Sequence, residues 1–535
     1  MGRVVGIDLG TTFSVIAYID ENGQPQVIEN KQGSRITPSA VLFGGKKPIV
    51  GERAKEKSIS DPGNYESFVK RHMGERNYRF TSRNGETFNA ETISSLILSK
   101  LKEDAEYRLG EPIDGAVITV PAYFSDPQRT ATSDAARLAK LNVLDIINEP
   151  TAAAIAFGMA KNITKKQKIM VYDFGGGTFD VSILDIDEDN ITVVATNGNH
   201  KLGGYDIDRE IFNWVKSEAE KAGFDIENDV KALQSIMIQA EKAKRDLSDE
   251  DETVITVYIR GEEFSVPLNR EKFEEEFIDS IIGRTLNTMQ NAMDDAGLKY
   301  SDIGKIILVG GSTRIPKVRS EIERVTGIKP SAEVHPDEAV AIGAAFHAVD
   351  IARKKSEGTF ESGAQSKLEK DFQIDADNLP DLEKSYTFRD VTSHGIGIVV
   401  SDGKNKKLMN SVIMKKNTPV PSQIVCDGYQ TAEPNQEVIL LQVTQGEDRD
   451  LQYAMIIGEA ELKLRPRDYI VQLRVIVTCD RDAIIHVHAI DFDKGFDSCE
   501  GIPLGEIKIN REKFNMTEEE LVAAEKQIHR LNIGD

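Results

Sequence analysis

Two turns rich in glycine and threonine, each opened by an aspartate, carry the residue types best suited to chemistry in this chain. Asp8 opens the turn Gly10-Thr11-Thr12. Asp173 opens the turn Gly175-Gly176-Gly177-Thr178, which Asp180 closes. The backbone N–H groups of such turns point into one concavity, where glycine leaves room for phosphate oxygens. One such turn would as readily be an ordinary hairpin, but two matched turns predict a polyphosphate gripped from both sides, with the carboxylates facing Mg²⁺.

A helical face in the middle of the chain suits a nucleoside. Glu241, Lys244, Arg245 and Ser248 are spaced at i, i+3, i+4 and i+7, so they share one face of a helix. Its carboxylate suits ribose hydroxyls, and its guanidinium suits stacking on a base. By itself the same face would equally fit a solvated surface with one ion pair inside the helix. No glycine loop is followed by the Lys-Ser or Lys-Thr pair of a Walker motif.

Apolar segments around the turns predict the layered α/β domain that must position them. Val4–Asp8 and Ile169–Asp173 each read as a buried strand leading into a turn, so the two turns belong to matching halves of a duplicated unit. Gly115–Val120 and Lys305–Val309 read as further strands, with helical patterns between them. The last of these strands leads into a further turn, Gly310–Pro316.

A change of composition and periodicity marks a second domain. Between Glu357 and Glu383 acidic residues predominate and large apolar side chains are few, which is typical of a solvated linker or insert. Beyond Tyr386 the hydrophobic pattern has a period of two, which predicts strands at Gly397–Ser401, Glu437–Thr444, Tyr469–Cys479 and Ala483–Asp491. Thr517–Glu520 then reads as the capping box of one helix.

Composition excludes several functional classes. The 535 residues carry a net charge of −22, which repels phosphate backbones, so we expect no nucleic-acid partner. No apolar run approaches the roughly 20 residues of a membrane helix, and we expect no signal peptide before the first strand. The three cysteines are an odd count that fits reduced thiols. We therefore expect a cytoplasmic protein without a membrane partner.

The motifs of the first part resemble the nucleotide-binding domain of the DnaK-type, seventy-kilodalton heat-shock chaperones. The segments that carry the resemblance are Ile7–Thr12, Val120–Phe124, Asn148–Ala154, Asp173–Asp180 and Val309–Pro316. The likeness runs in order from residue 4 to about 352, and more loosely from 390 to 509. It implies an α/β actin-like ATPase fold, with two lobes around a cleft. A β-sandwich peptide-binding domain and a short C-terminal helix would follow.

The resemblance assigns roles in the cleft. Lys70 would position the attacking water, Glu149 would face the same site, and Asp173 and Thr178 would complete the catalytic group. The acids expected around Mg²⁺ and its waters are Asp8, Asp173 and Asp180. K⁺ is a further candidate ion. The residues expected to hold ATP or ADP are Gly10, Thr11, Thr12, Phe13, Gly175, Gly176, Gly177, Gly203, Gly204, Glu241, Lys244, Arg245, Ser248, Gly310, Gly311, Ser312, Arg314 and Asp337. Arg245 and Arg314 would enclose the adenine.

The resemblance also implies sites outside the cleft. Pro121 and Arg129 would report the nucleotide state to the other domain, together with Asp390 in the linker. The candidates for the lining of a peptide groove, where sandwich core is the plainer alternative, are Tyr429, Ala432 and Ile439. The implied partners are unfolded or extended apolar polypeptides, a J-domain co-chaperone and a nucleotide-exchange factor.

Four departures from the family pattern change these expectations. Tyr386–Arg389 replaces the leucine-rich linker, which predicts weaker communication between the domains. Asp145 stands where many members have an arginine for the J-domain, so a conventional J-domain contact should be weak. Ser401 replaces a methionine over the peptide. A short helix stands in place of the helical lid, so we expect fast peptide release.

The sequence therefore predicts an ATP-hydrolysing chaperone whose grip on apolar peptides depends on the nucleotide. The expected domains are 1–355 (nucleotide-binding ATPase), 356–390 (acidic insert and linker), 391–509 (β-sandwich) and 510–535 (helical stub). The first alternative is an ATP-sensing adaptor that binds one dedicated partner through its β domain. The second is a small-molecule kinase of the same superfold, against which Lys70 and Glu149 argue.

Overall fold

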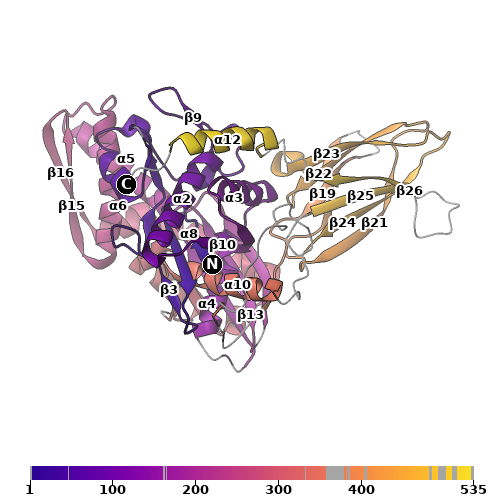
Figure 1. Cartoon of the computed structure of the whole chain (residues 1–535), viewed down its shortest axis with the longest axis horizontal. Coiled ribbons are helices and arrows are strands. Elements are labelled where there is room, and N and C mark those ends of the chain that lie inside the picture. Colours follow the sequence, from indigo (N-terminus) through magenta and orange to yellow (C-terminus); the bar gives the residue numbers. More distant parts are fainter. Residues whose placement is uncertain are drawn as a thin grey trace.

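The computed structural model shows a large body of mixed sheets and helices, with a β-sandwich to one side (Figure 1). It describes residues 3–356, 379–380, 382, 386–402, 407–480, 485–491, 502–508 and 515–531, apart from 46, 161, 162, 164, 189 and 332; for 502–508 it describes the backbone only. Most of the predicted acidic insert thus lies outside the described residues. No helix in the described part of the chain combines the length and the apolar character needed to cross a bilayer.

The first sheet of the body carries the first glycine and threonine turn. Its main path is β11 (Val143–Asn148), β10 (Ile113–Val120), β1 (Arg3–Asp8), β2 (Phe13–Ile19) and β3 (Pro25–Val27). β1, β10 and β11 run parallel, whereas β2 returns antiparallel to β1. The apolar middle of β1 is buried throughout, as in a strand covered on both faces. The turn between β1 and β2 therefore lies at the edge where parallel strands end.

The second sheet repeats this plan. Its order is β17 (Lys305–Val309), β12 (Gln167–Phe174), β13 (Phe179–Ile186), β14 (Asn190–Asn199) and β18 (Thr387–Arg389). β12 and β13 form an antiparallel hairpin in which Asp173 pairs with Asp180, and β17 runs parallel to β12. Both sheets thus bring an aspartate and a glycine-rich turn to a strand end, as the duplicated sequence pattern predicts.

Helices and small hairpins cover these sheets. The helices of the body are α1 (Glu52–Lys57), α2 (Ala90–Leu109), α3 (Asp126–Leu138), α4 (Glu149–Ala160), α5 (Gly204–Lys221), α6 (Val230–Asp249), α7 (Arg270–Lys272), α8 (Asp279–Ala296), α9 (Pro316–Thr326) and α10 (Ala339–Ser356). Its short strands are β4 (Thr37–Pro38), β5 (Ala40–Leu42), β6 (Ile49–Val50), β7 (Tyr65–Ser67), β8 (Phe80–Thr81) and β9 (Thr87–Phe88), with the longer hairpin β15 (Glu252–Ile259) and β16 (Glu262–Asn269). α4 and α10 pack together, and their alanines join the side chains of both sheets in one buried core. The two halves therefore share a core beneath the turns.

The β-sandwich consists of two four-stranded sheets. One has the order β20 (Leu408–Met414), β19 (Ile396–Ser401), β22 (Val438–Gln445), β23 (Met455–Lys463). The other has the order β21 (Ser422–Gln430), β24 (Gln472–Cys479), β25 (Ile485–Asp491), β26 (Ile502–Lys508). Inward side chains such as Ile398, Val443 and Val477 form its core.

The last helix, α12 (Glu518–Leu531), lies against the body rather than the sandwich (Figure 1). Thr517 and Glu520 form the predicted capping box: the Glu520 N–H donates to Thr517 Oγ1 over 3.2 Å, and the Thr517 N–H donates to Glu520 Oε2 over 2.8 Å. Leu521 and Ala524 pack on Leu138 of α3. The apolar stripe of this helix is therefore buried on the body.

Candidate functional site

A cavity of about 650 Å³ opens between the two halves of the body. The predicted residues that line it are Asp8, Gly10, Thr11, Thr12, Phe13, Lys70, Glu149, Asp173, Gly175, Gly176, Thr178, Glu241, Lys244, Arg245, Ser248, Gly310, Gly311, Ser312, Arg314 and Asp337. Four other predicted residues lie next to it without lining it: Gly177, Asp180, Gly203 and Gly204. Residues far apart in the chain thus meet at one site.

The floor of the cavity is strongly acidic around one cation. Lys70 Nζ lies 2.6 Å from Glu149 Oε1, and both side chains are buried. Burial, followed by Glu149, raises the pKa of Asp8 and that of Asp180 to about 7, and raises that of Asp173. For Lys70, burial favours the neutral amine, but Glu149 and Asp8 outweigh it and raise its pKa. The floor therefore holds more potential negative charge than Lys70 balances, so a bound cation would stabilise it.

The oxygen atoms of these carboxylates are ligands that suit Mg²⁺. In the part of the chain that the structure describes, no three His, Cys, Asp or Glu side chains come close enough for a ready-made metal site. Asp8, Asp173 and Asp180 therefore fit a Mg²⁺ ion that keeps several waters and takes other oxygens from phosphate, and they do not fit a closed protein cage.

The two glycine-rich turns face each other across the cavity. A Cβ atom on Gly176 would lie 1.8 Å from Thr12 Oγ1, and one on Gly177 would lie 2.4 Å from Thr11 Cγ2. Side chains at these glycines would collide with the opposite turn, so the close approach requires glycine. Ser312 Oγ donates to the Gly175 carbonyl over 2.9 Å, which fixes the third predicted turn against the second.

The wall opposite the floor comes from α6. Lys55 Nζ lies 2.6 Å from Glu241 Oε2, and Lys244 Nζ lies 2.8 Å from Asp208 Oδ1. Burial raises the pKa of Glu241, but Lys55 and Lys244 outweigh it and lower the pKa. The guanidinium of Arg245 lies 5.7 Å from the Phe13 ring centroid. The predicted helical face, formed by Glu241, Lys244, Arg245 and Ser248, thus lines the cavity.

The second wall contains the other predicted guanidinium. Arg314 Nη2 lies 2.6 Å from Asp337 Oδ2 and 3.2 Å from His335 Nε2. Arg245 and Arg314 both line the cavity, so both guanidinium groups reach the space expected for a base.

Sequence reasoning missed the groups that join the two halves across the cleft. Lys55 on α1 bonds Glu241, and Arg71 donates to the Gly177 carbonyl over 3.0 Å and pairs with Asp206. Neither cation carries a local signal, because its partner lies more than a hundred residues away in the chain. Arg71 follows Lys70 directly, and that adjacency was the one clue available.

The residues predicted to communicate between domains meet at the junction with the sandwich. Asn148 donates to the Asp390 carboxylate and accepts from Arg129, so Asn148 joins the two predicted residues. Burial raises the pKa of Asp390 and lowers that of Arg129. Pro121 lies at the end of β10, where its carbonyl accepts from the Phe124 N–H over 3.1 Å.

Further contacts hold the sandwich to the body. Lys416 Nζ lies 2.6 Å from Asp295 Oδ2, and the Thr196 N–H donates to Asn417 Oδ1 over 3.0 Å. Asp145, the residue at the expected J-domain position, bonds His347 Nε2 over 2.8 Å. Asp145 is thus joined to α10 in this structure.

The peptide-groove candidates are only partly brought together. Tyr429 and Ile439 are half-buried and pack on the same small core, and Tyr429 Oη lies 2.9 Å from Ser411 Oγ. Ala432 is exposed in the loop after β21, where its N–H donates to Gln436 Oε1 over 2.9 Å. Ala432 therefore does not belong to the small core that Tyr429 and Ile439 share.

A family model provides the comparison with known proteins. The model described as Hsp70 protein matches residues 4–357 and 378–532. The match spans both the body with its cleft and the sandwich, and it reaches α12. Proteins of this family bind ATP or ADP with Mg²⁺, hydrolyse ATP and act as chaperones of other polypeptides. With the cavity, its two phosphate-type turns and the attached sandwich, this match identifies the chain as a member of the Hsp70 family.

Proposed function

We propose that this chain hydrolyses ATP in the 650 Å³ cavity and uses the nucleotide to control how its β-sandwich binds extended apolar segments of unfolded proteins. The observation that carries the proposal is the buried Lys70–Glu149 pair, which lines the cavity with the two facing glycine turns, beside Asp8 and the buried Asp173 and Asp180. In this proposal the body up to residue 355 is the actin-like ATPase unit, and residues 391–509 form the peptide-binding unit.

The residues of the cavity divide the work. The backbone N–H groups of Gly10–Thr12 and Gly175–Thr178 hold the phosphates, while Glu241 faces the ribose and Arg245 and Arg314 enclose the base. Bound Mg²⁺ supplies positive charge to the phosphate oxygens. Lys70, kept protonated by Glu149, donates hydrogen bonds that orient a water for in-line attack. Such positioning and charge stabilisation supply most of the catalysis in phosphoryl transfer.

The sandwich and its attachment to the body support the peptide-binding part of the proposal. Tyr429 and Ile439 offer a half-buried apolar surface beside strand edges, which suits an extended peptide bound through its backbone. The junction through Asn148, Arg129 and Asp390 connects this unit to β11 and α3 of the ATPase body. Nucleotide-dependent rearrangement of that junction would alter peptide affinity.

The test is ATP turnover with and without a short extended apolar peptide, comparing wild type with Lys70→Ala. The exposed Lys242→Ala on α6 is the matched control. Wild type and the control should hydrolyse ATP and respond to the peptide, whereas Lys70→Ala should lose at least about a hundredfold in turnover while still binding nucleotide. If several such peptides left the rate of ATP turnover unchanged, the adaptor that binds one dedicated partner would be favoured. Phosphate transfer to an acceptor other than water would favour a kinase.

A further inference from the structure

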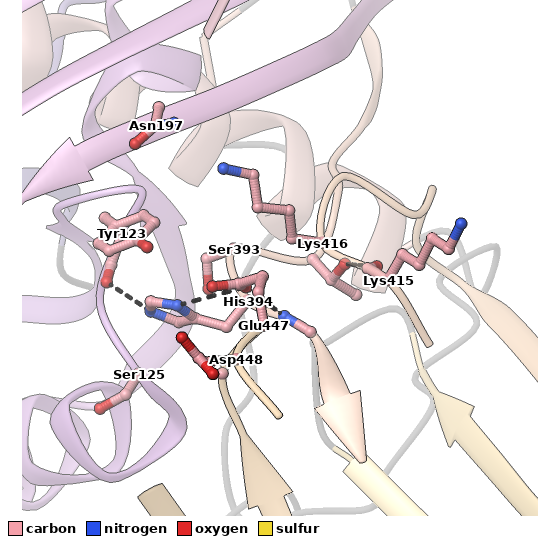
Figure 2. A network of polar contacts seen from close by, with 12 residues as sticks. Tyr123, Ser125, Asn197, Ser393, His394, Lys415, Lys416, Glu447 and Asp448 are labelled. Atoms are coloured by element: carbon pink, nitrogen blue, oxygen red, sulfur yellow. Dashed lines mark hydrogen bonds and ion pairs between the residues drawn. The ribbon is translucent and has the colours of Figure 1, made fainter. Parts of the chain in front are cut away.

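His394 occupies a central place in the contact between the sandwich and the body. Figure 2 shows its ring between Tyr123 of the body and Glu447 of the sandwich. His394 Nε2 lies 3.2 Å from the Tyr123 carbonyl oxygen, and the two rings pack at 60° with centroids 4.1 Å apart. The neighbouring Ser393 hydroxyl donates to the Phe124 carbonyl over 3.4 Å. The start of the sandwich is thus bonded to the segment after β10.

The hydrogen bond to Tyr123 defines which nitrogen of His394 carries a proton. A carbonyl oxygen only accepts, so Nε2 must donate. Nδ1 lies 4.0 Å from Glu447 Oε1, beyond hydrogen-bonding distance, and that oxygen accepts from the Gly395 N–H over 2.6 Å. A neutral ring with its proton on Nε2 therefore satisfies the contact that the structure shows.

Tyr123 also contacts the catalytic cleft through the other side of its backbone. Its N–H donates to Asp180 Oδ1 over 3.1 Å, and this bond lowers the pKa of Asp180 against the raising effects of burial and Glu149. One residue thus bonds the cleft carboxylate through its N–H and the sandwich histidine through its carbonyl. A displacement of the sandwich that withdraws His394 would free Tyr123, and with it the donor to Asp180.

We propose that His394 is a positioning residue that links docking of the β-sandwich to the placement of Asp180 through the backbone of Tyr123. The link rests on the proposed ATPase function, because it assigns Asp180 to the nucleotide cleft. The part of the proposal that concerns docking of the sandwich involves only residues of this chain and can be tested without nucleotide.

The charges around His394 determine how pH acts on this link. Glu447 and Asp448 face it from the connection between β22 and β23. Lys416 lies in the connection between β20 and β21, and His200 directly follows β14. Burial, with smaller effects from His200 and Lys416, lowers the pKa of His394 although Glu447 and the bond to Tyr123 raise it. A released, solvated histidine has a pKa of about 6.5. Undocking therefore takes up a proton, and acid should favour the undocked state.

The experiment measures hydrogen exchange of the β14 and β18 amides, which report docking, between pH 5.5 and 7.5 after correction for intrinsic exchange rates. Without nucleotide, wild type should lose up to about tenfold in protection per pH unit below about 6.5. His394→Leu, which lacks the donor, should lose about tenfold in protection at pH 7.5. His394→Gln, which keeps an N–H donor but does not titrate, should keep protection and lose its pH dependence. His488→Gln, on β25 outside the network of Figure 2, is the control and should behave as wild type.

Addition of MgATP tests the link to Asp180. Coupling between two sites is reciprocal, so the change in β18 protection caused by MgATP should shrink about tenfold in His394→Leu and persist in His394→Gln. An unchanged MgATP effect in His394→Leu would overturn the link, and an unchanged pH profile in His394→Gln would overturn the role of the ring. Absence of any nucleotide effect in wild type would instead contradict the proposed control of the β-sandwich by nucleotide. Exchange measured without nucleotide would still decide whether His394 holds the docked state.

Discussion

At the residue scale, Asp180 shows how burial at the floor of the cavity changes the pKa of a carboxyl group. Its side chain is 2% exposed, and its pKa of about 7 lies well above the roughly 3.9 of an unfolded aspartate. Between these pH values the folded protein binds a proton that the unfolded chain releases. The stability contributed by this raised pKa is therefore present at acid pH and lost as pH rises through about 7.

Replacing Asp180 by Asn should therefore raise the free energy of unfolding by about 1–3 kcal/mol at pH 8 and leave it nearly unchanged near pH 4. The fluorescence of Trp214, the only tryptophan, reports unfolding, because it packs on the core of the second half. The same variant should lose part of the stabilisation that MgATP gives, since one carboxylate near the cation is gone. Asp225→Asn, an exposed control, should show neither effect. A lower free energy of unfolding for Asp180→Asn at pH 8 would contradict the view that burial of the ionised Asp180 carboxylate destabilises the fold.

What the sequence reveals at this scale depends on whether a residue's partners are local. Asp8, Asp173 and the glycines after them share one turn with their function, so their spacing predicts their place at the cavity. Lys55 and His394 owe their positions to partners brought from distant parts of the chain, so their sequence neighbours carry no comparable signal.

At the scale of elements, β18 shows how the unusual linker binds the body. It pairs parallel to β14, and from Tyr386, which directly precedes it, the side chains alternate: Tyr386 and Phe388 point inward, whereas Thr387 and Arg389 are exposed. Tyr386 is buried, and its hydroxyl donates to the Gly158 carbonyl over 3.0 Å. A Cβ on Gly158 would lie 2.9 Å from the Tyr386 ring, so the ring uses the space that the glycine leaves. Arg389 faces solvent and does not prevent docking in this structure, although its charge suggested weaker communication.

Tyr386→Ala should therefore undock β18, because it removes both a buried ring and a hydrogen bond. We expect at least a hundredfold loss of protection at the β18 amides in hydrogen exchange, in keeping with about 3 kcal/mol for a buried aromatic ring. Tyr386→Phe, the matched variant, should lose about tenfold or less, because only the hydroxyl is removed. Equal losses in the two variants would show that the hydroxyl, and not the ring, holds the strand.

Elements of the sandwich were predicted unevenly, for a physical reason. β19, β22, β24 and β25 lie close to the predicted ranges, and β24 and β25 alternate strictly between buried and half-buried positions. β20, β21, β23 and β26 were not predicted; in β21 a register shift between Asp427 and Tyr429 in its pairing with β24 interrupts the alternation.

At the scale of the whole molecule, the contacts that hold the parts together include β18 on β14, the junction around Asn148 and His394, and α12 on α2 and α3. The third contact has a defined polar anchor. Arg76 binds the Glu520 carboxylate through two bonds of 3.0 and 3.1 Å and also donates to the Asn515 carbonyl. Two parallel bonds of this kind fix direction as well as distance.

Charge reversal at this anchor tests whether α12 is held by the pairing of these two residues. Glu520→Arg should place two like charges together and lower the protection of the α12 amides about three- to tenfold at low salt, a modest effect because both side chains are a third or more exposed. The exchanged pair, Arg76→Glu with Glu520→Arg, should recover part of that loss, and added salt should reduce both effects. Glu525→Arg on the same helix controls for helix charge, and it should leave protection almost unchanged. If the exchanged pair recovered nothing, docking would depend on the other contacts of α12, which include the packing of Leu521 and Ala524 on Leu138 and the Arg137–Glu518 ion pair.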